Sequence, residues 1–365
     1  MNEFLIDPTW YRPIFLHIVV LLSLFQAIKP SPDEISINKD SRDLICYWIF
    51  TFVMTIFIGL RPEHATFGDD YASLYRANTE FELGKDWLYS CMVYLGHRIG
   101  LEWSSFCLLC TALYFGGTAF AIRKIFTYRP LTALAVVFAA FSFFAYCTNG
   151  IRNGLGCAMF FIALAYYKER NWIGTILFAI IASGFHNSLL IPIVAFALCN
   201  FYSNTKHYVV FWFVCVAMSL VVGDFMQSIY ESLSFIDTGR EADYFLEHDD
   251  MSGYTFEGGF RWDFLAYSAV PIWIGYYFVT KMNYQNAYYK LILNMYIFVN
   301  ALWVLVNRNW LSNRIAFLSW FMYALVMMFP ILNMEYLKNM SRWIAYTVMV
   351  NATFSYIMWI LGKYH

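Results

Sequence analysis

The chain has 365 residues, of which 60% are hydrophobic and only 13% are charged, whereas a typical soluble domain is about 25% charged. A soluble core cannot bury that much apolar surface, so the composition excludes an ordinary soluble protein. The formal net charge is −1, and we expect no nucleic-acid partner.

Apolar runs follow one another along the chain, separated by short polar breaks. Because a helix needs about 17 to 25 apolar residues to cross a bilayer, the runs predict an all-α, polytopic transmembrane bundle of about twelve spans. We place them near 13–28, 44–60, 103–122, 131–148, 150–167, 171–184, 188–202, 208–223, 262–280, 289–307, 314–330 and 343–361. The N-terminus has no basic region or cleavage site, so we expect the first span to be retained. No repeat or linker divides the chain, and residues 1–365 are expected to form one transmembrane domain.

The charges are distributed unevenly between alternate breaks. One set of breaks holds 13 Lys and Arg against 6 Asp and Glu, while the rest of the chain holds 11 against 19. Cytoplasmic loops are enriched in Lys and Arg, so the first set is predicted to be cytoplasmic. Its breaks begin at Lys29, Arg123, Lys168, Lys206, Lys281 and Lys338.

Two long acidic loops, 61–102 and 224–261, then lie on the extracytoplasmic side. In the first loop, apolar residues from Trp87 to Ile99 recur at helical spacing over about 14 residues, which indicates an interfacial helix rather than a span. The second loop, rich in Asp, Glu, Gly and Tyr, is either a mobile lid over a site or a solvated connection.

Several arginines are predicted at the outer ends of spans or in the outer loops. Burying an arginine in a bilayer is costly, so each needs a partner or a function. The ordinary explanation is an ion pair or snorkelling toward water. A cluster of guanidinium groups would instead bind a lipid-linked phosphate or diphosphate. The residues concerned are Arg61, Arg152, Arg240, Arg261, Arg308 and Arg314.

Three further groups are candidates for chemistry. His186 lies in an outer break, where it either accepts a proton from an attacking hydroxyl or ties two helices together. Asp69 and Asp70 are adjacent carboxylates that can hold a metal, pair with Arg61 or cap a helix, but no third ligand is evident. Cys107 and Cys110 lie in an apolar span, where packing thiols are expected.

Four short motifs occur in an order that resembles one known family. Gly59-Leu60-Arg61, followed by Gly68-Asp69-Asp70-Tyr71 and Tyr75, resembles the "GLR … GxDY" signature of EpsG-like, Wzy-type polysaccharide polymerases. Ile151-Arg152-Asn153 is similar to their "LRQ" motif, with Asn153 in place of the usual glutamine. Phe185-His186-Asn187-Ser188 resembles their "FHxS" motif, and Asn313-Arg314-Ile315 resembles the arginine that begins a late span.

The resemblance implies a GT-C-like membrane glycosyltransferase of the bacterial inner membrane, acting in O-antigen, lipopolysaccharide or capsule synthesis. Donor and acceptor would both be oligosaccharides on undecaprenyl diphosphate, joined on the periplasmic or outer face. A chain-length regulator protein and membrane lipid are the other partners implied. No nucleotide sugar is needed, in line with the absence of a P-loop or dinucleotide motif. We expect neither a metal nor any other cofactor.

Within this scheme we assign His186 as the base, with Asp70 as the next candidate, and Arg152 as the group that holds the diphosphate. Arg61, Arg314, Arg261, Tyr71 and Asn187 are expected to contact the diphosphate or glycan. The alternatives are an O-antigen ligase, which shares the donor, a flippase or transporter for a lipid-linked sugar, and a membrane acyltransferase that uses His186.

Overall fold

The computed structural model describes residues 6–28, 41–67, 70–81, 84, 86–232, 259–308, 312–334, 337 and 339–361. Every regular element in these ranges is a helix, which confirms the predicted all-α class. The chain forms two compact units: residues 1–189 with 323–365, and residues 190–322. The expectation of one transmembrane domain stays a prediction.

The first unit consists of eleven α-helices within the described ranges. They are α1 (Tyr11–Ile28), α2 (Ser41–Gly59), α3 (Asp70–Ala77), α4 (Trp87–Arg98), α5 (Trp103–Ile125), α6 (Pro130–Phe138), α7 (Phe141–Thr148), α8 (Ile151–Lys168), α9 (Trp172–Phe185), α16 (Tyr323–Asn333) and α17 (Met340–Ile360). Short 3₁₀ turns precede α1 (η1, Pro8–Trp10), precede α3 (η2, Ala65–Phe67) and follow α9 (η3, Asn187–Leu189).

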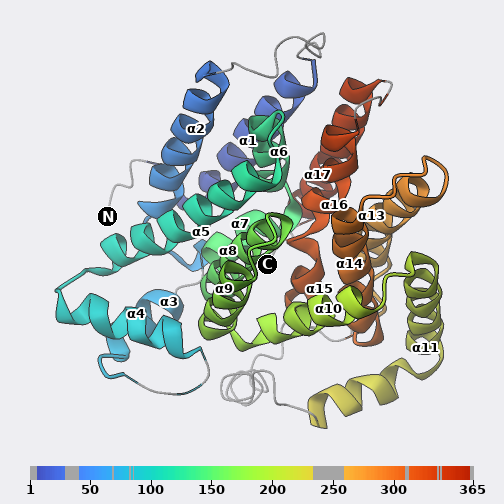
Figure 1. Ribbon diagram of the computed structural model, residues 1–365. Coiled ribbons are helices and arrows are strands. Elements are labelled where there is room, and N and C mark those ends of the chain that lie inside the picture. The colour runs from blue at the N-terminus through green and yellow to red at the C-terminus, as the bar shows by residue number, and fades with distance from the viewer. Residues whose placement is uncertain are drawn as a thin grey trace. The chain divides into compact units, whose positions relative to one another are not determined.

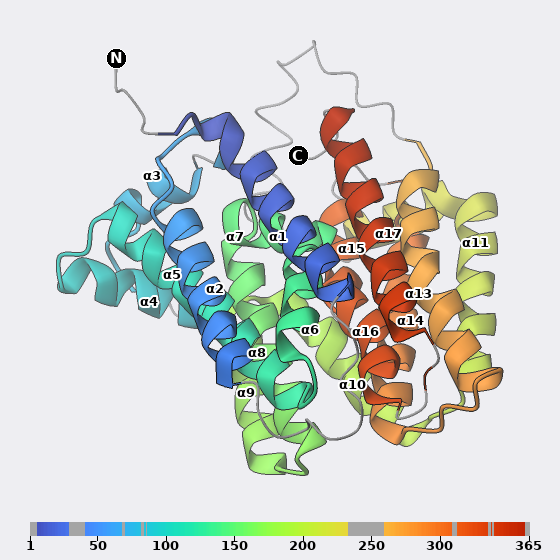
Figure 2. The same cartoon turned by 90° about the horizontal axis from the view of Figure 1, so that it is seen from above.

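Helix α8 is the centre of the first unit. It packs against α9 and α5, and α5 packs in turn against α2 (Figure 1). Glycine permits the close approach of α9, since a Cβ on Gly156 would lie 3.0 Å from the carbonyl oxygen of Ala182. On another side of the unit, α1 lies beside α17 and also contacts α6 (Figure 2). Small residues and buried apolar side chains therefore hold this unit together, as in other membrane helix bundles.

The second unit is organised around α14. Its described helices are α10 (Leu190–Phe201), α11 (Thr205–Ser232), α13 (Trp262–Thr280), α14 (Ala287–Leu305) and α15 (Ser312–Trp320). All the others pack against α14. Buried polar side chains join them: Trp212 Nε1 donates to Asn300 Oδ1 at 2.8 Å, and Asn300 Nδ2 donates to Ser319 Oγ at 3.0 Å. Such bonds between helices satisfy polar groups that no water reaches.

Helices suited to crossing a membrane occur in both halves of the sequence. Among the residues that the structure describes, six are long and apolar enough by length and composition, or seven if the bent pair α6 and α7 forms one broken span. Those two helices meet at 68°, inside the run expected as a continuous span over 131–148. Each of the twelve predicted spans coincides with a helix or a helix pair, but Asp43–Gly59 of α2, α9 and η3 with α10 are shorter apolar helices, and a count of twelve is not confirmed. The GT-C-like fold also stays a prediction.

In the first unit, two breaks that the charge pattern assigns to the same side of the membrane contact each other. At one end of α8, Lys168 donates to the Ile125 carbonyl, and Lys124 forms an ion pair with Glu169 at 2.7 Å. These residues come from two breaks assigned to the cytoplasm. The other end of α8 carries Arg152, which contacts the long loop 61–102. Which end faces outward stays a prediction.

The loop 61–102 contains α3 and the short helix α4, which is 12 residues long and is not a candidate span. Helix α4 buries Val93 and Gly96 against the protein and exposes Trp87 and Leu95, and Ile99 at its C-cap is also exposed. An exposed apolar face suits the predicted interfacial position. Of the second predicted outer loop, 224–261, residues 233–258 lie outside the described residues, so neither a lid nor a solvated connection is tested.

Candidate functional site

Asp86 is the residue around which the candidate site is built. Its side chain is 5% exposed, and its carboxylate accepts hydrogen bonds from three other residues. Arg152 Nη1 forms an ion pair with Oδ2, while His186 Nδ1 lies 3.0 Å from Oδ1 and 3.1 Å from Oδ2. The backbone N–H of Asn187 donates to Oδ1 at 3.0 Å. Asp86 therefore joins the two motif residues that we expected to do the chemistry, Arg152 and His186.

The backbone of Asp86 explains why its carboxylate is available to other elements. The residue occupies the N-cap of α4 in the left-handed region, with φ 60° and ψ 36°. Its carbonyl accepts the first helical hydrogen bond from the N–H of Ser90, but its side chain makes no capping bond to α4. Asp is among the few residues other than glycine that adopt this conformation readily. The side chain consequently reaches α8 and the end of α9.

Arg152 is placed by the tight junction between α7 and α8. Helix α8 starts after Gly150, and Arg152 is its second residue. A Cβ on Gly154 would lie only 2.5 Å from the carbonyl oxygen of Tyr146, so only glycine fits against α7 here. The first turn of α8 is thus held against α7. The Arg152 side chain stays 19% exposed.

His186 is placed by the end of α9. Its φ of −158° and ψ of 124° are extended, so the helix stops and the chain turns into η3. Two residues earlier, Gly184 lies under the Trp87 indole, where a Cβ would be 2.9 Å from the ring. This contact docks the start of α4 on the end of α9. As a result, Asp86 and His186 become neighbours although 100 residues separate them.

The surroundings of Asp86 favour its charged form. Burial raises the pKa of the Asp86 carboxyl, but its neighbours together lower that pKa by more and hold it below its usual range. These causes are the hydrogen bond from His186, the electrostatic influence of His186 and Arg152, and the hydrogen bond from the Asn187 N–H. The carboxylate is therefore ionised at neutral pH. A buried ion pair offsets its desolvation cost only when hydrogen bonds satisfy the remaining lone pairs, and this carboxylate meets that condition.

The hydrogen bond to Asp86 also sets the role of the histidine ring. Because an ionised carboxylate only accepts hydrogen bonds, Nδ1 of His186 carries the proton. In the neutral ring Nε2 is then the basic atom. Among the described residues, Nε2 makes no hydrogen bond. This arrangement of carboxylate, imidazole and free Nε2 is suited to accepting a proton from a hydroxyl.

A second link ties the two motifs together. Ser188 Oγ donates to Asn153 Oδ1 at 3.1 Å, next to the contacts of His186 and Arg152. Asn153 is the position at which the chain departs from the family motif. Its amide therefore has a structural use here, in holding the start of α8 to the turn after α9.

Arg61, expected among the substrate-binding residues, has a different environment. It is 5% exposed, its Nη1 donates to the Ile58 carbonyl at 3.0 Å, and its guanidinium lies 5.8 Å from the ring centre of Phe67. No hydrogen bond or ion pair among the described residues joins it to Asp86 or His186. The structure thus shows Arg61 bound to backbone and an aromatic ring, and its role toward substrate stays a prediction.

The "GxDY" motif falls at the start of α3. Tyr71 is partly exposed on this helix, while Asp69 and the side chain of Asp70 lie outside the described residues, so the proposed base or metal role of Asp70 is not tested. Tyr75 anchors α3: its hydroxyl donates to the Leu101 carbonyl at 2.7 Å, and its ring stacks on His97.

Arg261 and Arg314 belong to the second unit. Arg261 forms a two-pronged ion pair with Asp263, at 2.9 and 2.8 Å, and lies 3.5 Å from the ring centre of Phe264. This corresponds to the ordinary ion-pair explanation. Arg314 is exposed on the first turn of α15, whereas Arg240 lies outside the described residues. Whether these residues meet Arg152 in one cluster stays a prediction.

Asp86 is the one residue of this site that the sequence interpretation missed. It stands in an outer loop that is rich in carboxylates, and no motif marks it. The available signal was its position directly before the amphipathic helix that begins at Trp87. That position predicts an N-cap, but the carboxylate instead bonds residues of α8 and the turn after α9.

Comparison with known proteins places these residues within one family. A family model described as the EpsG family matches residues 44–365, which include Asp86, Arg152 and His186. No curated protein and no solved structure matches the chain. The EpsG family is associated with glycosyltransferase-like membrane proteins of polysaccharide polymerisation. Since the match spans most of the sequence and contains the motifs recognised above, the chain belongs to the EpsG family.

Proposed function

We propose that the protein is a polysaccharide polymerase that transfers a growing glycan from undecaprenyl diphosphate to a sugar hydroxyl of the next lipid-linked repeat unit. The observation that carries the proposal is the buried Asp86 carboxylate shared by Arg152 and His186. It combines the two groups that such a transfer needs: a base for the hydroxyl and a cation for the leaving diphosphate. Membership in the EpsG family, which is associated with polysaccharide polymerisation, supports a glycan substrate.

The proposed step is a direct displacement at the anomeric carbon. The acceptor hydroxyl oxygen forms a bond to that carbon while the bond to the diphosphate oxygen breaks, and the diphosphate leaves with the electron pair. The hydroxyl proton passes to Nε2 of His186. Asp86 keeps the ring in the required tautomer and stabilises the imidazolium that forms, as the carboxylate of a catalytic triad does.

Arg152 supplies positive charge next to the base. Its ion pair with Asp86 orients the guanidinium, and its side chain stays 19% exposed, which supports a contact with the diphosphate. A preoriented cation is most effective where negative charge develops during the reaction. Contacts from Arg61, Tyr71, Asn187, Arg261 and Arg314 to the lipid diphosphate or glycan remain part of the proposal, as does the outward orientation of the site.

A single displacement has a stereochemical consequence. Asp86 is held by Arg152, His186 and the Asn187 N–H, so it is poorly suited to attack the sugar as a nucleophile. With one base and no covalent intermediate, the new bond forms on the face opposite the diphosphate. We therefore propose that the configuration of the transferred sugar is inverted.

The proposal is tested with the purified full chain in lipid nanodiscs, given only lipid-diphosphate-linked repeat units. We expect a ladder of longer glycans without any nucleotide sugar. His186→Ala should slow elongation by about 10² to 10⁴ while donor binding persists. His64→Ala, an exposed histidine outside the site, is the matched control and should elongate normally. Elongation by well-folded His186→Ala at the wild-type rate would refute the proposed base.

The same assay distinguishes the rival functions. An O-antigen ligase would join the donor glycan to a different lipid acceptor and give no ladder from repeat units alone. A flippase would move the lipid-linked sugar across vesicle membranes with no change in chain length. An acyltransferase would leave the glycan length unchanged and consume an acyl donor.

A further inference from the structure

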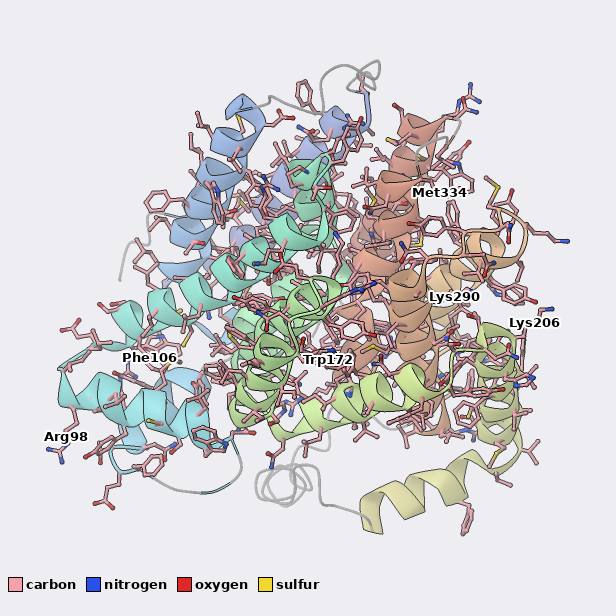
Figure 3. All side chains as sticks on the ribbon, in the orientation of Figure 1. Arg98, Phe106, Trp172, Lys206, Lys290 and Met334 are labelled. Atoms are coloured by element: carbon pink, nitrogen blue, oxygen red, sulfur yellow. The ribbon has the colours of Figure 1, made fainter. Side chains whose placement is uncertain are left out.

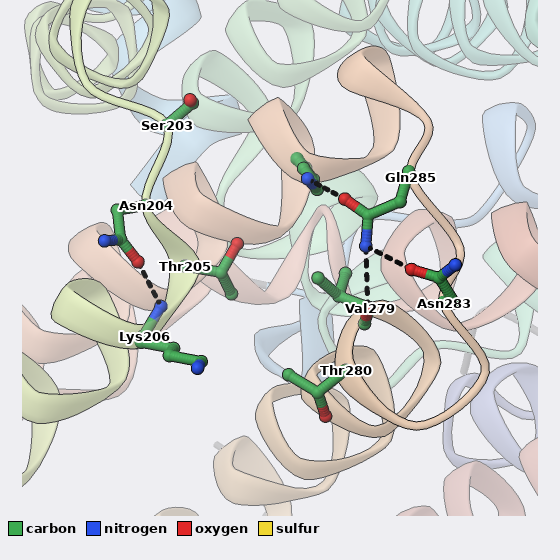
Figure 4. Close-up of a pocket in the computed structure, with 9 residues that line it drawn as sticks. Ser203, Asn204, Thr205, Lys206, Val279, Thr280, Asn283 and Gln285 are labelled. Atoms are coloured by element: carbon green, nitrogen blue, oxygen red, sulfur yellow. Dashed lines mark hydrogen bonds between the residues drawn. The ribbon is translucent and has the colours of Figure 1, made fainter.

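The second unit contains a polar cavity that has no part in the proposed reaction. It has a volume of about 390 Å³ and lies between two chain segments: the start of α11, and the turn from α13 to α14 (Figure 4). Lys206 and Thr205 contribute from the first segment, and Thr280, Gln285 and Lys290 from the second. Of the lining residues only Val279 is apolar, and none is acidic. Figure 3 shows Lys206 and Lys290 in the same region of this unit.

The charged residues that line the cavity are both lysines. No Asp or Glu occurs between residues 170 and 223 or between 264 and 334, so both segments lie in long stretches without a carboxylate. Lys206 Nζ makes no ion pair or hydrogen bond among the described residues. Lys290 donates only to the neutral amide of Gln285. Two lysines without acidic partners give the cavity a positive charge, which favours an anion.

Neutral groups of the cavity are also arranged to donate. Thr205 is 5% exposed, and its hydroxyl makes no hydrogen bond with any described residue. A buried hydroxyl without a partner is costly unless a ligand or water satisfies it. Thr205 is also the first residue of α11, where the helix dipole favours negative charge. These features match the oxygens of a phosphate group.

The apolar surface beside the cavity indicates where that phosphate comes from. Phe201 is 92% exposed two residues before the cavity begins, and Tyr277 and Met282 are exposed on the other segment. Exposed apolar side chains next to lysines are the pattern of a membrane interface, where basic pockets bind anionic headgroups. We propose that this cavity binds the phosphate headgroup of an anionic phospholipid, whose chains lie along the exposed apolar side chains.

The proposal is tested by native mass spectrometry of the delipidated full chain, exposed to mixed micelles of equimolar phosphatidylglycerol and phosphatidylcholine. We expect the wild type to retain phosphatidylglycerol preferentially. The double variant Lys206→Gln with Lys290→Gln should lower this preference about 30-fold, from about fivefold per lysine. Lys281→Gln is the matched control, since it removes an exposed lysine of the same turn that does not line the cavity, and should keep the preference.

Several outcomes would overturn the proposal. Equal retention of both lipids by the wild type, or equal losses in the double variant and Lys281→Gln, would leave only general charge attraction. Thermal stabilisation by inorganic phosphate alone that equals the effect of phosphatidylglycerol, and depends on the same lysines, would assign the cavity to a free anion. If the double variant does not fold, Thr205→Val, which keeps every charge, should lower the preference about fivefold. An unchanged preference in that variant would also contradict the proposal.

Discussion

Replacing Asp86 with asparagine separates the positioning role of the carboxylate from its place in the fold. Asparagine has the same shape and tolerates the left-handed backbone conformation of this residue. Its amide oxygen can still accept the N–H of Asn187. The negative charge is lost, and with it the ion pair to Arg152 and the carboxylate acceptor for Nδ1 of His186.

We expect Asp86→Asn to lower both the stability and the turnover of the protein. Removing one partner of a buried ion pair costs about 3 to 5 kcal/mol, and we expect a loss near 3 kcal/mol because Arg152 remains 19% exposed. We expect the effect on turnover to be larger than this effect on stability. The new amide NH₂ donates to Nδ1 of His186, so the ring proton moves to Nε2 and the base is lost. The corresponding change in a catalytic triad lowers kcat by about 10⁴.

The pH dependence of stability gives an independent check on Asp86. Folding lowers the pKa of this carboxyl, so its contribution to the free energy of unfolding is fully present above the unfolded value, near 3.8, and is lost as pH falls through the lower folded value. The difference in Tm between wild type and Asp86→Asn should therefore be largest at neutral pH and decrease below about pH 4.

The assay measures Tm, donor binding and chain elongation on the same preparations. The matched control is Glu169→Gln, which breaks the more exposed ion pair with Lys124 and should cost less than about 1 kcal/mol with elongation unchanged. If folded Asp86→Asn elongates glycans at the wild-type rate, the carboxylate does not position the base. If both variants lose Tm equally, the buried pair contributes no more than a surface pair.

Three further changes probe the placement of the site. Gly184→Ala puts a Cβ 2.9 Å from the Trp87 indole, so we expect the free energy of unfolding to fall by about 1 to 3 kcal/mol and elongation to slow. Adding Trp87→Leu to the same chain should restore part of the stability and part of the elongation rate. Arg152→Lys keeps the charge but loses the planar fork, so kcat should fall more than about tenfold with little change in donor binding; unchanged kcat would exclude two-pronged contact with diphosphate. In a cysteine-free background, Glu80→Cys should react with an impermeant thiol reagent in intact cells and Lys281→Cys should not, and the opposite result would reverse the topology.

The sequence determined much of this protein because membrane helices are specified locally. An apolar run of sufficient length must form a helix in lipid, since no other open structure satisfies its backbone. The positions of the helices, the class of the fold and the family therefore follow from composition, run length and four short motifs. Arg152 and His186 are candidates from their predicted position in the outer breaks, from their side-chain chemistry and from these motifs, and the structure brings them to one carboxylate.

Only the tertiary structure decided which carboxylate that is. Asp86 lies 66 residues from Arg152 and 100 from His186, and its selection depends on the docking of α4 on α9 through Trp87 and Gly184. The bend of 68° between α6 and α7 was equally hidden, because a continuous apolar run does not reveal where a helix breaks. Hydrogen-bond partners and helix breaks result from packing between distant segments, and that packing leaves no periodic trace in the sequence of either segment.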